Sequence, residues 1–347
     1  MQISSYNSLN EIFFLQFEKY QNEDHLFFNN LNLKKFQTYT WADTNNNVLK
    51  LAKFLNEKKI IKGDRVLLVS ENRPEWLIAD LAILLNSGIT VPNYTTYTVN
   101  DFAFTINDCK PSGLIVSSPQ LLKNILLAAR KINYNFNFII LLNETNEVVA
   151  DNVINFSTII EKKIDIEETK IFFKKINKSL IRKDPACIIY TSGTQGTPKG
   201  VVLSHGGILK NCEGALEFLD FIKNSRSTFL TWLPLSHSYE HTVQFVQLTL
   251  GAKIFYSESL DKLMSNLKIA KPTIMTAVPR FYTNLVNKIK INLQNQSHLK
   301  KIIFQKTLQL GEKKVLGIQM SFFEKIINFI LDLIVRKKIK NQFGGKI

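Results

Sequence analysis

Apolar residues in the first half of the chain fall into two kinds of segment, and the two kinds alternate. Short, β-branched runs bounded by turn residues are typical of buried strands, whereas apolar residues that recur at three and four positions indicate helices. The strand-like runs lie at 65–70, 88–94, 113–116 and 138–142, and helical patterns lie at 74–86 and 119–132. This alternation predicts an α/β fold with layered, mostly parallel sheets that are covered by helices on both faces.

The remaining pattern extends this scheme to both ends of the chain. We expect further helices at 9–17, 41–55, 205–221, 243–250 and 260–270, and strands at 228–233, 253–256 and 274–277. A turn-rich stretch ends near Thr40, residues 143–182 have a weak pattern that is typical of a link between sheet layers, and 281–341 is largely helical and rich in lysine. A chain of 347 residues is long enough for two subdomains, which we place at 1–180 and 181–347.

Charge and cysteine content narrow the class of protein. The net charge is +15, but the lysines are dispersed and no basic motif is interleaved with aromatic residues, so we expect no nucleic-acid partner. Cys109, Cys187 and Cys212 form no close pairs, which indicates a reducing, cytoplasmic environment without disulfides. The N-terminus lacks the basic and apolar regions of a signal peptide.

The basic stretch from Leu299 to Lys340 has two interpretations. Its most apolar window, 317–335, is interrupted by Glu324, Lys325 and Asp332, so it is too polar to span a bilayer. The stretch is either a set of packing helices with one apolar face, or an amphipathic segment that makes weak peripheral contact with the inner, anionic face of a membrane.

The segment YTSGTQGTPKG, residues 190–200, carries the strongest chemical signal. Strand-like runs flank it on both sides, so we expect a polar loop between two strands. Glycines allow backbone N–H groups to face an anion, hydroxyls donate to phosphate oxygens, and Lys199 adds a point charge. The alternative is an ordinary solvated turn. The loop is not a Walker motif, because Lys199 is followed by Gly200 and an apolar strand instead of Ser or Thr and a helix.

A second stretch, WLPLSHSYEH at 232–241, places His237 on a loop beyond the end of a strand, where open α/β sheets bind ligands. A histidine in this position is more often structural than functional. His237 and His241 are four residues apart, a spacing that can also hold a metal ion on a helix, although Pro234 argues against a helix at His237.

These two motifs resemble those of the acyl-adenylate-forming (AMP-binding) superfamily, which includes acyl-CoA synthetases and luciferases. TAVPRFY at 276–282 and VPNYTTYTVNDFAFTINDCKPSGLIV at 91–116 are similar to segments of the long-chain fatty acid–CoA ligases. The resemblance covers residues 40–347. It implies ATP-dependent activation of a fatty acid to an acyl-adenylate and then, with CoA, to acyl-CoA.

The resemblance also assigns roles to residues. Lys199 and His237 are the implied catalytic residues, and His237 with Tyr239 borders the implied acyl pocket. The residues implied to bind the ATP phosphates are Thr191, Ser192, Gly193, Thr194, Gly196, Thr197 and Lys199.

Some motifs of the superfamily do not occur in this chain. It has no Gly-Tyr-Gly-x-Thr-Glu string, whose Glu helps to hold Mg²⁺ in the family, and the family's ribose-binding Asp and C-terminal lysine have no counterpart. We therefore expect an N-terminal portion that has no useful ligase activity alone, whose C-terminal portion is missing or separately encoded. Two alternatives remain: a non-catalytic remnant that binds acyl chains or a partner, and a ligase for another carboxylic acid.

Overall fold

The computed structural model describes residues 3–30, 35–144, 152–191, 198–219, 226–257 and 259–347. They form two compact units, Met1–Ser227 with Thr231–Glu258, and Thr228–Leu230 with Ser259–Ile347. Residues 180 and 181 both lie inside the first unit, and the proposed subdomains 1–180 and 181–347 stay a prediction.

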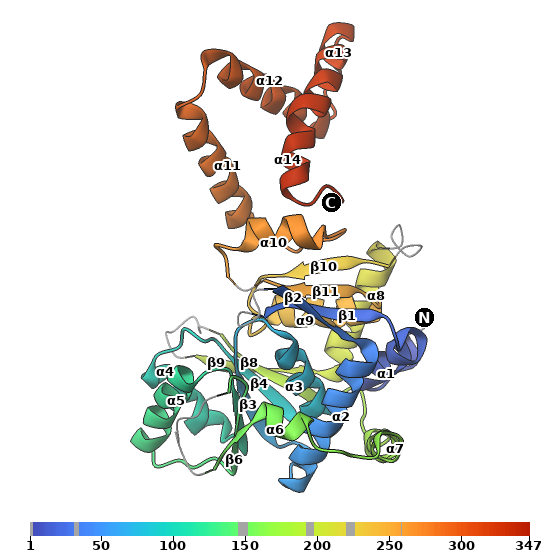
Figure 1. Ribbon diagram of the computed structural model, residues 1–347, viewed down its shortest axis with the longest axis vertical. Coiled ribbons are helices and arrows are strands. Elements are labelled where there is room, and N and C mark those ends of the chain that lie inside the picture. Colours follow the sequence, from blue (N-terminus) through green and yellow to red (C-terminus); the bar gives the residue numbers. More distant parts are fainter. Residues whose placement is uncertain (1–2, 31–34, 145–151, 192–197, 220–225, 258) are drawn as a thin grey trace. The chain divides into compact units, whose positions relative to one another are not determined.

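The first unit alternates strands and helices along the chain (Figure 1). Its helices are η1 (Ile3–Ser5), α1 (Leu9–Tyr20), α2 (Trp41–Glu57), α3 (Pro74–Leu85), α4 (Val99–Cys109), α5 (Pro119–Lys131), α6 (Phe156–Ile160), α7 (Ile166–Asn177), α8 (His205–Phe218) and α9 (Ser238–Thr249). Its strands are β1 (Asp24–Asn30), β2 (Lys35–Thr40), β3 (Arg65–Val69), β4 (Ile89–Asn93), β5 (Gly113–Val116), β6 (Phe138–Leu141), β7 (Val153–Asn155), β8 (Pro185–Thr191), β9 (Lys199–Ser204) and β11 (Lys253–Tyr256).

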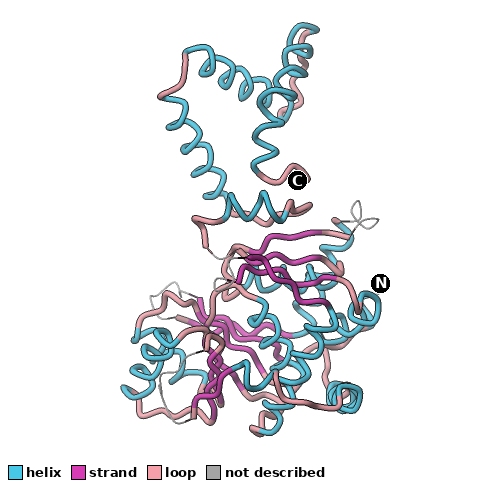
Figure 2. Tube along the Cα trace, viewed as in Figure 1, coloured by secondary structure: helices cyan, strands magenta, loops and turns pink. Residues whose placement is uncertain are grey.

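The larger sheet of this unit has seven strands in the order β7-β6-β5-β3-β4-β8-β9. The strands of the chain are drawn in magenta in Figure 2. All neighbours are parallel except β8 and β9. Along β3, Val66 and Leu68 enter one apolar core while Leu67 and Val69 enter another, because successive side chains of a strand point to opposite faces. The predicted α/β fold with mostly parallel, two-sided sheets is therefore confirmed.

A smaller sheet contains β11, β1 and β2, with β1 parallel to β11 and antiparallel to β2. The rings of Phe27 and Phe255 stack across it with their centroids 4.1 Å apart. The expectation of a turn-rich stretch before Thr40 was wrong here. β1 pairs with a strand more than 200 residues away, so local polarity did not report its structure.

Three other expectations need correction. Residues 143–182 are more than a link, because they contain β7, α6 and α7. Helix α9 begins at Ser238 instead of 243, since His237 caps it. The strand expected at 274–277 is reduced to a single parallel bridge between Phe229 and Ile274.

The second unit is almost entirely helical. It contains most of β10 (Thr228–Thr231) and the helices α10 (Leu263–Ala270), α11 (Pro279–Gln294), α12 (His298–Val315), α13 (Phe322–Leu331), a π-helical turn η3 (Asp332–Arg336) and α14 (Lys337–Gln342). None of the helices in the described ranges has both the length and the apolar content to cross a bilayer.

Candidate functional site

The YTSGTQGTPKG segment begins and ends in two antiparallel strands, as the sequence predicts. Strands β8 and β9 pair so that Thr191 lies opposite Lys199 and Tyr190 opposite Gly200. Thr191 and Lys199 are both exposed at the open end of this ladder. The hairpin therefore places a hydroxyl and an ammonium group side by side where the loop begins and ends. Ser192, Gly193, Thr194, Gly196 and Thr197 lie outside the described residues.

Tyr190 fixes the base of the hairpin to the sheet. Its side chain is buried, and its hydroxyl donates to Asp108 Oδ2 on α4 at 2.5 Å. Burial and the Asp108 carboxylate raise the pKa of Tyr190, so it remains a neutral donor. A Cβ atom at Gly200 would lie 3.0 Å from Ile188 Cγ2 and 3.2 Å from the Tyr190 ring. Gly200 therefore allows β9 to lie closely against these two side chains.

The second motif forms a turn that leads into α9. His237 is the N-cap residue of this helix, and its Nδ1 accepts a hydrogen bond from the backbone N–H of Tyr239 at 3.2 Å. Both the His237 and the Tyr239 side chains are exposed, so they are accessible to a ligand. The capping bond gives His237 a structural role whether or not it also contacts a substrate.

Asn72 holds the turn in place from the loop after β3. Its amide nitrogen donates to the Leu233 carbonyl at 2.7 Å, and its amide oxygen accepts from Leu235 N–H at 3.1 Å. These two bonds satisfy the backbone on both sides of Pro234, which has no N–H of its own. Sequence reasoning missed Asn72, because nothing in its local surroundings points to a partner 161 residues away.

His237 at the start of α9 is exposed, whereas His241 lies in the core. Its Nε2 lies 2.9 Å from Asp80 Oδ2, and Thr90 Oγ1 donates to the other carboxylate oxygen at 2.6 Å. Burial alone would lower the pKa of His241, but the Asp80 carboxylate, with a smaller contribution from Cys187, raises it to about 10. The Asp80 carboxylate therefore stabilises the protonated form of His241.

The structure thus separates the two histidines of the motif. His237 is exposed at the helix N-terminus, whereas His241 is directed at Asp80, so the pair does not form the two-histidine metal site that the spacing allows. In the described part of the chain, no three His, Cys, Asp or Glu side chains are grouped so that they could hold a metal ion.

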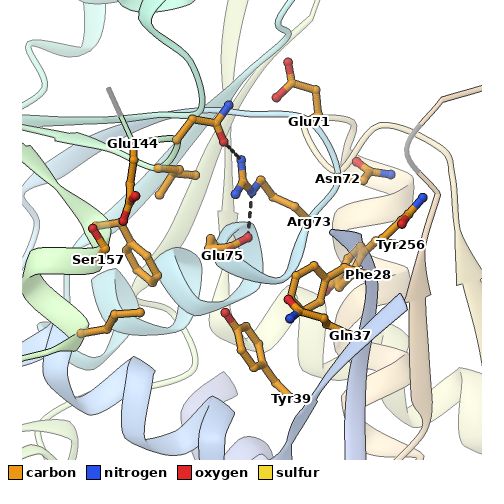
Figure 3. Close-up of a pocket in the computed structure, with 15 residues that line it drawn as sticks. Phe28, Gln37, Tyr39, Glu71, Asn72, Arg73, Glu75, Glu144, Ser157 and Tyr256 are labelled. Atoms are coloured by element: carbon orange, nitrogen blue, oxygen red, sulfur yellow. Dashed lines mark hydrogen bonds and ion pairs between the residues drawn. The ribbon is translucent and has the colours of Figure 1, made fainter. Parts of the chain in front are cut away.

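A separate cavity of about 740 Å³ opens beside the loop after β3 (Figure 3). Its lining residues are Phe28, Asn29, Gln37, Tyr39, Glu71, Asn72, Arg73, Glu75, Leu142, Asn143, Glu144, Phe156, Ser157, Ile160 and Tyr256. Among the described site residues expected from the sequence, Thr191, Lys199, His237 and Tyr239, none lines it. Asn72 does, so one side chain both borders this cavity and holds the turn before His237.

Arg73 is paired with two other polar residues of the cavity lining. Arg73 Nε lies 2.7 Å from Glu75 Oε2, and Arg73 Nη1 donates to Asn143 at 2.6 Å (Figure 3). Burial, and next the Glu75 carboxylate, raise the pKa of Tyr39 to about 12, so this phenol stays protonated. With Glu71, Glu75 and Glu144 against Arg73, the lining carries more acidic than basic side chains.

Comparison with known proteins places these features in a family. The model for the AMP-binding enzyme family matches residues 13–330. Long chain acyl-CoA synthetase 7, peroxisomal, of Arabidopsis thaliana is 30% identical over 288 residues, which is 82% of this chain and 40% of that protein. Long-chain-fatty-acid–CoA ligase 5 of Rattus norvegicus is 27% identical and is matched over 90% of this chain and 46% of its own length. The chain therefore spans less than half the length of these relatives.

Solved structures agree on the fold. A long-chain-fatty-acid-CoA ligase (FadD1) from Archaeoglobus fulgidus superposes on 84% of this chain and 55% of its own with a TM-score of 0.64 and 20% identity. A luciferase-like enzyme from the mealworm Zophobas morio gives a TM-score of 0.66 over 81% of this chain and 62% of its own, at 19% identity. With the family model matched over most of its residues, this chain belongs to the AMP-binding enzyme family.

Proposed function

We propose that this chain supplies the ATP-phosphate site and part of the acyl site of a long-chain fatty acid–CoA ligase. The observation that carries the proposal is the β8–β9 hairpin, which brings Thr191 and Lys199 together at the two ends of the YTSGTQGTPKG loop. Membership of the AMP-binding family supports the use of ATP, and the long-chain relatives support a fatty acid as the substrate.

The proposed reaction has two steps. A fatty-acid carboxylate oxygen attacks the α-phosphorus of ATP, which forms an acyl-adenylate and expels pyrophosphate. The CoA thiolate then attacks the acyl carbonyl carbon and expels AMP. Both steps bring negative groups together, so preorganised positive charge and hydrogen-bond donors lower the barrier.

Within this scheme, Lys199 and the hydroxyls of Thr191, Ser192 and Thr194 hold the β- and γ-phosphates, with Gly193, Gly196 and Thr197 in the same loop. His237 and Tyr239, on the first turn of α9, border the acyl group. Mg²⁺ would add positive charge at the phosphates when bound. No described cluster of carboxylates and histidines offers it a site, and we assign it no ligand in this chain.

Nucleotide binding by the chain tests the phosphate site. We expect Lys199→Ala to weaken ATP binding about tenfold or more, because one charge-assisted contact to phosphate is lost. AMP, which lacks the β- and γ-phosphates, should bind both proteins equally. Isothermal titration calorimetry with each nucleotide measures the two affinities.

Lys175→Ala on α7, another exposed lysine of the first unit, is the matched control and should leave both affinities unchanged. Equal ATP affinity in wild type and Lys199→Ala would overturn the phosphate-site assignment. Fatty-acid-dependent ATP–pyrophosphate exchange, measured with a version extended to the length of the relatives, tests the substrate class. Exchange with aromatic or short acids but not with long-chain acids would replace the fatty acid by another carboxylic acid.

A further inference from the structure

The positive charge of the chain is concentrated in one of its two units. Ser259–Ile347 contains 17 Lys and Arg against 4 Asp and Glu, a net charge of +13 out of +15 for the whole chain. The first unit is therefore nearly neutral. The net positive charge is thus mostly a property of residues 259–347, as the lysine-rich pattern of 281–341 already indicates.

Exposed apolar side chains are concentrated in the same unit. Of the 30 large apolar side chains that are exposed among the described residues, 20 lie in Ser259–Ile347. Helices α11 and α14 bury no residue, and α13 buries only Leu331. Packing helices would bury one apolar stripe, so within the described structure the packing interpretation of this stretch does not account for these side chains.

Helix α13 and the turn η3 carry a continuous apolar surface, which we call the α13 face. It consists of the exposed residues Phe322, Phe323, Ile326, Ile327, Ile330, Leu333 and Ile334. Residues 322, 326, 330 and 333 recur at the helical spacing, and 323, 327, 330 and 334 form the neighbouring row. Phe322 and Phe323 are 74% and 75% exposed, so the face begins with two nearly free aromatic rings.

Cations surround this face, and the nearby acidic groups are paired. Lys325, Lys337, Lys338 and Lys340 are exposed along α13 and α14. Glu324 is held by Lys313 at 2.6 Å, and Asp332 by Arg336 at 2.6 Å. Phenylalanine and isoleucine on one side with lysines at the margins is the composition of a helix that lies in the interface of an anionic bilayer. A nucleic acid would satisfy the lysines but leave the α13 face in water.

We propose that the α13 face, with its flanking lysines, docks the protein on a membrane surface that contains anionic lipid. The helix lies in the plane of the interface, with Phe322 and Phe323 among the acyl chains and the lysines at the lipid phosphates. This surface belongs to the second unit alone and needs no nucleotide, so its test is independent of the phosphate site.

Vesicle binding by the complete 347-residue chain tests the proposal. We expect the chain to sediment with phosphatidylglycerol–phosphatidylcholine vesicles at least about tenfold better than with pure phosphatidylcholine, and the difference to shrink as salt is added. The Phe322→Ser, Phe323→Ser double variant should bind the anionic vesicles at least about tenfold more weakly than wild type. Phe172→Ser, at a half-exposed ring on α7, is the matched control and should bind like wild type.

The lysines are tested by Lys337→Glu and Lys338→Glu together, with Lys175→Glu and Lys178→Glu on the first unit as the control. The first pair should weaken binding and flatten its salt dependence, and the second should not. The three tryptophans, Trp41, Trp76 and Trp232, all lie in the first unit. Phe323→Trp therefore adds one local reporter, whose emission should shift to the blue on anionic vesicles and be quenched by brominated acyl chains.

Equal sedimentation with and without anionic vesicles would overturn the proposal. It would also be overturned if the Phe172→Ser control lost as much vesicle binding as the Phe322→Ser, Phe323→Ser variant. A Phe323→Trp signal that is insensitive to brominated lipid would also contradict it. If the Phe322→Ser, Phe323→Ser variant instead dissolves an oligomer seen by analytical ultracentrifugation without lipid, while vesicles leave both proteins free, the face is a contact between copies of the chain and the membrane assignment is wrong.

Discussion

Asp80 and His241 are the clearest case of a residue whose role depends on a distant partner. From the sequence, His241 was one half of a spacing that can hold a metal ion, because only its neighbours in the chain were visible. The structure pairs it with a carboxylate on α3, 161 residues away, in a site where both side chains are almost completely buried. The residue types along the chain therefore located the motif, but did not show which of its histidines is buried and which is exposed.

This pair makes a prediction about stability and pH. We expect Asp80→Asn to lower the free energy of unfolding by about 3 kcal/mol at neutral pH, because it leaves the protonated imidazole of His241 buried without its counter-ion. The raised pKa of His241 contributes stability that is fully present below the ordinary value of 6.5 and is lost as the pH rises toward about 10. The difference in the free energy of unfolding between wild type and Asp80→Asn should therefore become smaller as the pH rises from 6.5 to 10. Urea denaturation at several pH values measures it.

The exposed Lys174–Glu18 pair, at 2.9 Å, supplies the control. Lys174→Gln should change stability by less than about 1 kcal/mol, with no such pH dependence, because solvent screens a surface pair. A difference between Asp80→Asn and wild type that stays constant over this pH range would contradict a charged His241.

At the scale of elements, the sequence was most informative where a strand is buried on both faces. Strands β3, β5 and β6 are continuous apolar runs, and each was located within one or two residues. Strands β1 and β2 were missed, because they are polar and their pairing is with each other and with the distant β11. The start of α9 was also misplaced, since a histidine is an unusual N-cap and Pro234 suggested that the loop continued.

Helix α9 allows the capping and ligand roles of His237 to be separated. His237→Asn keeps a side-chain oxygen that can accept the Tyr239 N–H, whereas His237→Ala removes the cap, at a cost of about 1 kcal/mol. If His237 borders the acyl group, both variants should bind an acyl sulfamate analogue of the acyl-adenylate several-fold more weakly. Thermal unfolding and a binding titration measure the two effects.

The outcome for His237→Asn decides between the roles. Wild-type affinity in this variant, together with reduced affinity in His237→Ala, would mean that the histidine acts only through the helix. Tyr239→Phe is a useful companion, because it changes the exposed hydroxyl beside His237 without altering the backbone N–H that the cap uses.

At the scale of the whole molecule, the two units differ in how much of their surface is removed from water. The first unit has two apolar cores, one on each face of the larger sheet. In the second unit, buried apolar side chains are confined to a few positions, among them Leu263, Leu267, Leu310 and Leu331. The sequence predicted helices in both places, since periodicity reports a local pattern and not whether a partner covers the apolar side.

Hydrogen exchange should show this difference directly. We expect backbone amides of α11–α14 to exchange at least about a hundredfold faster than those of α2, α3 and α5, because local opening costs less where few apolar contacts are broken. Mass spectrometry of peptic fragments measures both sets in one experiment. Equal protection in the two units would show that the helices of the second unit are stabilised by contacts other than buried apolar side chains.

The position of β9 in its sheet determines how the length of the β8–β9 connection can vary. In the described part of the chain it is the last strand of its sheet and is held by the single ladder to β8. Residues inserted or deleted between Thr191 and Lys199 would therefore change the length of the loop without altering the register of any parallel strand. Changes of length here should therefore be tolerated by the fold but not by ATP binding, which the proposed function assigns to the same residues, whereas changes of length at the inner crossings should destabilise the fold itself.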